Sequence, residues 1–155
     1  MRTATTIEAS AGRDAVEFAV EAEKLGLDVC WVAEAWGADA PSPLGYLAAR
    51  TSTMLLGSGV IQVGTRSPVT IAQTAMTLAH LSGGRFLLGL GVSGPQVMEG
   101  LHGIGFGRPL ARTREAPQVT QTMPATNPSQ PARIRRNSIY HLAASREDMT
   151  VLSVC

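Results

Sequence analysis

The sequence has few of the residues that mark a disulfide framework, a membrane span or a nucleic-acid surface. It contains two cysteines, and Cys30, inside an apolar run, is expected to be a small core residue. No apolar stretch approaches the roughly 20 residues of a spanning helix, and the first residues lack a signal-peptide pattern. A formal net charge of +1 gives no general attraction to nucleic acid or membrane. We therefore expect a cytoplasmic protein without either partner.

Glycine is missing from the last part of the chain. All 16 glycines lie in residues 1–110, whereas residues 111–155 hold one aromatic residue, Tyr140, and a cluster of prolines. This change predicts a folded domain over residues 1–115 and an irregular or disordered tail over residues 116–155. A frameshift in a gene rich in G and C would produce such an abrupt change after Glu115, and reading the coding DNA in the other frames tests that hypothesis.

Residues 1–110 instead alternate between helical and extended patterns. The expected elements are a helix over 14–25, a strand over 28–34, a helix started by Ser42 and Pro43, a strand over 54–61, a helix started by Ser67 and Pro68, and a strand over 85–91. The strands begin about 26 and 31 residues apart, which is the length of a βα unit. Parallel strands with helical crossovers are predicted, either in a closed barrel or in an open doubly wound sheet. In both architectures ligands bind at the carboxyl ends of the strands.

Gly89, Gly91 and Gly94 spell the pattern GxGxxG. A dinucleotide fingerprint would open a helix directly after it, but Pro95 and further glycines predict a loop-like segment there. Two other interpretations stay open. The glycines allow tight packing, or the loop presents unpaired N–H groups to a phosphate or a ring carbonyl.

Few side chains are candidates for chemistry. Glu34 ends a buried strand, where partial burial would suit it to proton transfer, and the alternative is an ordinary loop salt bridge. Trp31 and Trp36 could face a planar cofactor or belong to the core. His80 is expected to cap a helix, and His102, in a glycine-rich loop, is a better ligand candidate. Histidines and cysteines lack metal-ligand spacing, so no metal site is expected.

Residues 14–115 resemble the luciferase-like monooxygenase superfamily, in particular its class dependent on the deazaflavin coenzyme F420. The resemblance rests most specifically on the run TRSP after a glycine-ended strand and on LSGGRFLLGLG followed by VSGP. It implies a (β/α)8 TIM barrel, of which this chain would supply about three to four βα units. It also implies hydride transfer between the deazaflavin and a small organic substrate, or monooxygenation in relatives that use FMN.

The resemblance further implies a site. The bond between Gly59 and Val60 would be a cis peptide that supports the back of the deazaflavin ring. Ala35 stands where several relatives carry a catalytic histidine, which leaves Glu34 as the nearest titratable candidate. Cofactor contacts are implied for Ala35, Gly59, Val60, Gln62, Val92, Ser93, Gly94 and Pro95.

Two departures from the family limit what this chain is expected to do. Residues 4–7 are a poor strand candidate, so the first barrel strand is expected to be missing or degraded. Three or four strands cannot close an eight-stranded barrel, so we expect feeble or no cofactor binding and no activity by the chain alone. The alternative is a non-enzymatic fragment that self-associates or binds a partner through an exposed sheet edge.

Overall fold

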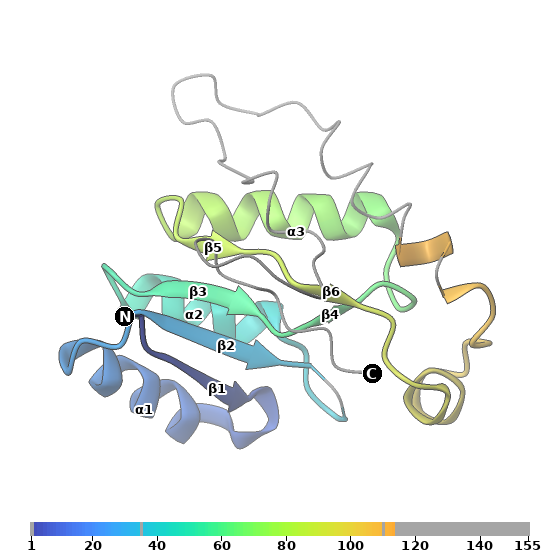
Figure 1. The fold of residues 1–155 in the computed structure, drawn as a ribbon, viewed down its shortest axis with the longest axis horizontal. Helices are drawn as coiled ribbons and strands as arrows, with labels where there is room; N and C mark the ends of the chain where they lie inside the picture. The colour runs from blue at the N-terminus through green and yellow to red at the C-terminus, as the bar shows by residue number, and fades with distance from the viewer. Residues whose placement is uncertain (1, 35, 110, 114–155) are drawn as a thin grey trace.

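The computed structural model describes residues 2–34, 36–109 and 111–113 (Figure 1). Its main sheet has four parallel strands in the order β1, β2, β3 and β5, so strands consecutive in the chain are neighbours, apart from the short β4. The strands are β1 Ala4–Glu8, β2 Val29–Ala33, β3 Leu55–Ser58 and β5 Phe86–Leu87. A second parallel pair consists of β4 Ile61–Gln62 and β6 Leu90–Gly91.

The helices lie side by side along the sheet. They are α1 Gly12–Lys24, α2 Pro41–Arg50 and α3 Pro68–Leu81, with a short 3-10 helix η1 Ala9–Ala11 and a π-helix η2 Gln96–Leu101. Helix α1 contacts α2, and α2 contacts α3, which places all three on one side of the strands (Figure 1). A doubly wound sheet would carry helices on both faces. Sequential strand order with helices on one side is the arrangement of a partial (β/α) barrel, as the resemblance implies.

The core lies between the sheet and the helices. On β2, Cys30 and Val32 belong to this core, whereas Trp31 points to the other face and packs against Gly57. The expectation that Cys30 is a core residue is confirmed, since it is fully buried. The largest fully buried members of the core are Leu44, Leu47, Met54, Leu56, Ile61 and Ile71.

The first barrel strand is present, so the expectation that it is missing or degraded is wrong. Strand β1 pairs in parallel with β2, from Ala4 opposite Val29 to Glu8 opposite Ala33. Ile7 is its buried residue and joins the core. A single large apolar side chain is a weak signal in a sequence, but an edge strand needs little more than one buried residue and its backbone ladder.

Helix starts were predicted correctly at α3 and incorrectly at α2. Ser67 caps α3, and its side chain accepts a hydrogen bond from the N–H of Thr70 at 3.1 Å. Helix α2 instead begins at Pro41, and Ser42 is not its N-cap. The carboxylate of Asp39 accepts hydrogen bonds from the N–H and the hydroxyl of Ser42, both at 3.0 Å. Aspartate accepts hydrogen bonds from the N–H groups of a first helical turn as well as serine does. The helix therefore begins one residue earlier than Ser42.

Two predicted long strands are each divided in two. The expected strand over 54–61 separates into β3 and β4 at the Gly59–Val60 bond, which is cis as the resemblance implies. The expected strand over 85–91 separates into β5 and β6. Between the two breaks, the buried hydroxyl of Ser58 donates to the carbonyl of Gly89 and accepts from its N–H, both at 2.9 Å. A side chain thus replaces the backbone ladder at this point.

The segment after Gly94 is not the loop that its glycines and Pro95 predict. Pro95 is the N-cap residue of η2, where its missing N–H costs nothing. Met98, in the middle of η2, is almost fully buried and anchors the turn.

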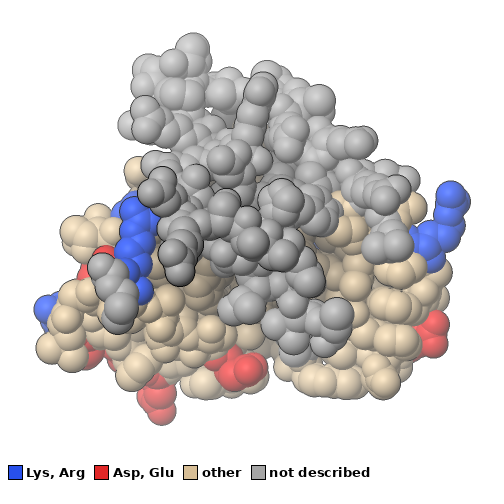
Figure 2. All heavy atoms as spheres, in the orientation of Figure 1, with Lys and Arg blue, Asp and Glu red and all other residues tan. Residues whose placement is uncertain are grey.

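The distribution of charged side chains and the apolar character of the helices bear on possible contacts with nucleic acid or membrane. In Figure 2, the visible basic side chains lie at the margins of the molecule near acidic ones. No helix among the described residues has both the length and the apolar character that a membrane crossing requires.

Candidate functional site

Three chain turns meet at the carboxyl ends of the strands. Ile61 pairs with Leu90 and Gln62 with Gly91, which joins the turn after β4 to the turn after β6. The side-chain amide of Gln62 donates to the backbone carbonyl of Glu34 at 3.3 Å, which adds the turn after β2. These turns form one rim, as parallel βα units predict.

The Gly59–Val60 bulge is held from both sides. On one side, a Cβ atom on Gly59 would lie 3.3 Å from the Cβ of Trp31. On the other, a Cβ on Gly91 would lie only 2.5 Å from Cγ2 of Val60. The side chain of Val60 therefore occupies the space that the glycine leaves open, and the bulge cannot be separated from β6 without creating a void.

Packing explains two of the three glycines in GxGxxG. A Cβ on Gly89 would lie 2.0 Å from the carbonyl oxygen of Ser58, and backbone cannot move aside as a side chain can. Gly91 leaves space for the side chain of Val60. A Cβ on Gly94, by contrast, would meet only the flexible end of the Gln96 side chain. The close-packing interpretation is sufficient for the first two glycines.

The loop after β6 carries backbone N–H groups that have no acceptor among the described residues. The N–H groups of Val92, Ser93 and Gly94 donate to no residue in the described part of the chain, and neither does that of Val60. Ser93 has a φ of 61°, a left-handed conformation that is uncommon for serine. Val92, Ser93 and Gly94 are partly exposed, while Pro95 is exposed. Backbone N–H groups without a protein acceptor can donate to an anion or a carbonyl oxygen of a ligand.

Glu34 is engaged by a cation that the sequence interpretation did not include. Its side chain, 7% exposed, forms a two-pronged ion pair with Arg66, with Nη1–Oε1 at 2.5 Å and Nη2–Oε2 at 3.0 Å. The N–H of Ala40 donates to Oε2 at 2.9 Å. This geometry is that of the loop salt bridge named as the alternative to proton transfer. Arg66 lies within the specific run TRSP, but its partner is 32 residues earlier.

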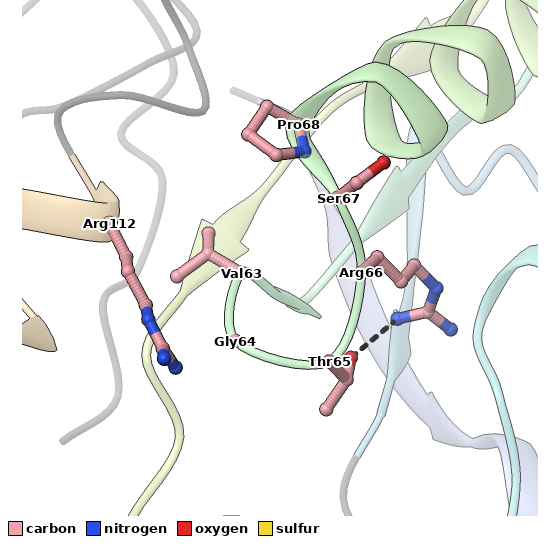
Figure 3. A pocket seen from close by; sticks show the side chains of 7 residues that line it. All are labelled: Val63, Gly64, Thr65, Arg66, Ser67, Pro68 and Arg112. Atoms are coloured by element: carbon pink, nitrogen blue, oxygen red, sulfur yellow. Dashed lines mark hydrogen bonds between the residues drawn. The ribbon is translucent and has the colours of Figure 1, made fainter. Parts of the chain in front are cut away.

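A pocket of about 400 Å³ lies beside the turn that carries Arg66 (Figure 3). Residues 63–68, which lead from β4 into α3, form one wall, and Arg112 approaches from the opposite side (Figure 3). Gly64 permits this approach, because a Cβ there would lie 3.2 Å from Nη1 of Arg112 and 2.4 Å from Cε of Met98. No motif in the sequence indicated Arg112 as a site residue.

The remaining candidates are dispersed. Trp31 lies behind the bulge, and Trp36 is 57% exposed at the end of β2. His80 is in the last turn of α3, as expected for a capping residue, but its Nε2 is buried and has no hydrogen-bond partner among the described residues. His102 is the C-cap residue of η2. Ala35 lies outside the described residues.

Comparisons with known proteins show which proteins this chain resembles in sequence. A Mycobacterium tuberculosis protein named as a coenzyme F420-dependent oxidoreductase is 54% identical over 99 residues, which are 64% of this chain and 28% of that protein. The F420-dependent glucose-6-phosphate dehydrogenase of Amycolatopsis mediterranei is 40% identical over 89 residues, 51% of this chain and 27% of the enzyme. The chain thus spans less than a third of the length of these relatives.

Solved structures share the fold. An F420-dependent secondary alcohol dehydrogenase, in complex with an F420-acetone adduct, superposes with a TM-score of 0.68 at 24% identity, over 78% of this chain and 42% of that one. The oxygenating component of 3,6-diketocamphane monooxygenase from Pseudomonas putida, in complex with FMN, superposes with a TM-score of 0.67 at 19% identity. The match covers 77% of this chain and 38% of that one. The family model described as luciferase-like monooxygenase matches residues 1–141, and this chain therefore belongs to the luciferase-like monooxygenase family.

Proposed function

We propose that this chain supplies part of a deazaflavin site in an oxidoreductase that transfers hydride between coenzyme F420 and a small organic substrate. The proposal rests on the N–H groups of Val92, Ser93 and Gly94, which have no acceptor among the described residues. They follow β6, which packs against the Gly59–Val60 bulge. Such donors suit a phosphate or a ring carbonyl oxygen of a cofactor. Bound coenzyme F420 would supply the hydride chemistry, and the protein would orient it.

Three features of the residues around these donors support a ring that rests on the Gly59–Val60 bond. The side chain of Val60 packs against Gly91, and Trp31 packs against Gly59. The Gly59–Val60 bulge is therefore supported on both sides. Gln62 is nearly fully buried and fixes the rim through the carbonyl of Glu34. Pro95, the N-cap residue of η2, ends the donor loop. We include Gly59, Val60, Gln62 and residues 92–95 in the proposed site, with Ala35 as a further contact.

Coenzyme F420 is the first choice of cofactor and FMN the second. The relatives that are 54% and 40% identical carry F420 in their names, whereas the FMN complex is only 19% identical to this chain. Substrate transformation is proposed for a whole protein of the relatives' length. For this chain, which spans 28% of the first relative, we expect weak cofactor binding and no turnover.

Amide chemical shifts test the site even when binding is weak. Coenzyme F420 and, separately, FMN are titrated to millimolar concentration into the isotopically labelled chain. We expect changes confined to amides near Val60 and residues 92–94, larger for F420. Gly94→Leu, which adds a bulky side chain to the donor loop itself, should abolish them, whereas Gly105→Leu, where the added side chain meets open space, should not. Shifts elsewhere, or none at millimolar cofactor, would contradict the proposal.

A second candidate function is association through the edge of the sheet. Within the described residues β1 pairs with β2 alone, which leaves the backbone groups of its other edge without a strand partner. Sedimentation over a hundredfold range of protein concentration tests this candidate. Concentration-dependent self-association would support it, and a monomer throughout the range would refute it.

A further inference from the structure

The ion pair between Glu34 and Arg66 has the features of a positioning device. Both carboxylate oxygens accept from the guanidinium fork, at 2.5 and 3.0 Å, and the side chains of Glu34 and Arg66 are only 7% and 20% exposed. A planar guanidinium that binds a carboxylate with two parallel hydrogen bonds fixes orientation as well as distance. The pair is therefore more rigid than a single-contact salt bridge.

The pair connects the turns that form the rim. Oε2 of Glu34 accepts from the N–H of Ala40, just before α2, and Oε1 accepts from the N–H of Gln62 at 3.4 Å. Nη1 of Arg66 also donates to the hydroxyl of Thr65 at 3.3 Å (Figure 3). One buried contact thus links the turns after β2 and β4 with the start of α3.

The same contacts leave Glu34 poorly placed for proton transfer. Its two oxygens already accept four hydrogen bonds, two of them from a permanent cation.

We propose that Glu34 and Arg66 are a positioning pair that holds the cofactor-binding rim in shape, and that Glu34 does not transfer the proton of the reaction. The inference rests on the proposed deazaflavin site, since that is what the pair would position. Arg66 becomes a positioning residue for cofactor binding, acting through Glu34 and Gln62.

The test compares cofactor affinity and amide exchange in the full chain carrying Glu34→Gln, Arg66→Gln or both. A positioning pair predicts that each single substitution weakens F420 binding by about tenfold, the effect of losing a charged hydrogen bond. The double variant should be no weaker than the singles, because it leaves no charge unpaired. Each single variant should also speed hydrogen exchange at the N–H of Ala40 by about tenfold or more.

Arg50→Gln is the matched control. Arg50 forms the same two-pronged contact with Glu17, at 3.0 Å for each prong, but this pair lies between α1 and α2 and is 38% and 43% exposed. It should change neither F420 affinity nor the exchange of Ala40. Should Arg66→Gln not fold, Arg66→Lys, which keeps the charge but loses the fork, replaces it in both comparisons.

The outcomes separate the two proposals. A Glu34→Gln variant that binds F420 as tightly as the parent, or an Arg66→Gln variant with parental Ala40 exchange, overturns the positioning role. If the parent shows no cofactor-induced shifts, the proposed deazaflavin site fails, and Ala40 exchange alone still decides whether the pair holds the rim.

Discussion

Trp31 faces Gly57 across the ladder between β2 and β3, and its ring occupies the space that a Cβ on Gly57 would need. The two residues are in register, and the missing Cβ would lie 2.2 Å from both Cε3 and Cζ3 of the indole. The absence of a side chain at Gly57 thus determines where the largest side chain of β2 lies, directly behind the bulge that begins at Gly59.

Gly57→Ala should destabilise the chain by about 1–3 kcal/mol, since the indole must leave its position in a packed site. Urea unfolding measures the change. Gly100→Ala is the control, because a Cβ there meets nothing within 4 Å, and it should be neutral or slightly stabilising. Equal stability of the two variants would mean that Trp31 moves freely.

Ser58→Ala should cost about 1–3 kcal/mol, because the N–H of Gly89 loses its acceptor in a buried site. The carbonyl of Gly89 keeps one donor, the N–H of Ile61 at 2.9 Å, so the penalty falls mainly on the N–H. Urea unfolding again provides the measurement. As a comparison, Ser42→Ala removes an exposed hydroxyl contact and should change stability by no more than about 0.5 kcal/mol. A Ser58→Ala variant as stable as Ser42→Ala would refute the prediction.

Arg85→Lys should destabilise the opposite end of the barrel by about 1–3 kcal/mol. The guanidinium donates to the carbonyls of Ala48, Thr51 and Met54 and to the hydroxyl of Thr51, which closes the end of α2. An ammonium group cannot reproduce that fork. Arg50→Lys, in an exposed pair, should cost no more than about 1 kcal/mol. Thermal unfolding distinguishes the two, and equal losses would contradict the assigned role.

Stability should fall at alkaline pH because of Cys30. Burial raises the pKa of the Cys30 thiol from 9.0 to about 11, so above pH 9 the unfolded chain releases this proton and the folded chain retains it. The unfolded state then binds fewer protons, and the free energy of unfolding decreases between pH 9 and 11 by roughly 3 kcal/mol. Urea unfolding at several pH values measures the slope. The free energy of unfolding of Cys30→Ala should change less between pH 9 and 11. The same slope in both proteins would mean that other groups cause the loss of stability.

Most of the secondary structure could be predicted from local patterns. Ser67 with Pro68 started α3, and Gly83 and Gly84, with φ of 63° and 85°, ended it as expected. Prediction failed where the deciding interaction was not local in sequence. Strand β1 is stabilised by its ladder with β2, about 25 residues later, and the breaks in the two long strands depend on Ser58 meeting Gly89.

The candidate site was predictable only in part. The resemblance indicated the cis bond at Gly59–Val60, because it belongs to a recognisable run of residues. Arg66 was overlooked because nothing near it in the sequence identifies its partner. Charge pairing over 32 residues depends on how two turns come together, and that is a property of the barrel.

By itself, the sequence determined the alternation of helices and strands, the burial of Cys30 and the family, since these follow from periodicity, capping residues and short motifs. Tertiary structure alone decided that Glu34 lies in a guanidinium fork, that Gly57 makes room for Trp31 and that two strands break beside Ser58. The physical reason is distance. Hydrophobic period and capping act within a few residues, whereas close packing and buried charge pairs require segments about 30 residues apart to meet.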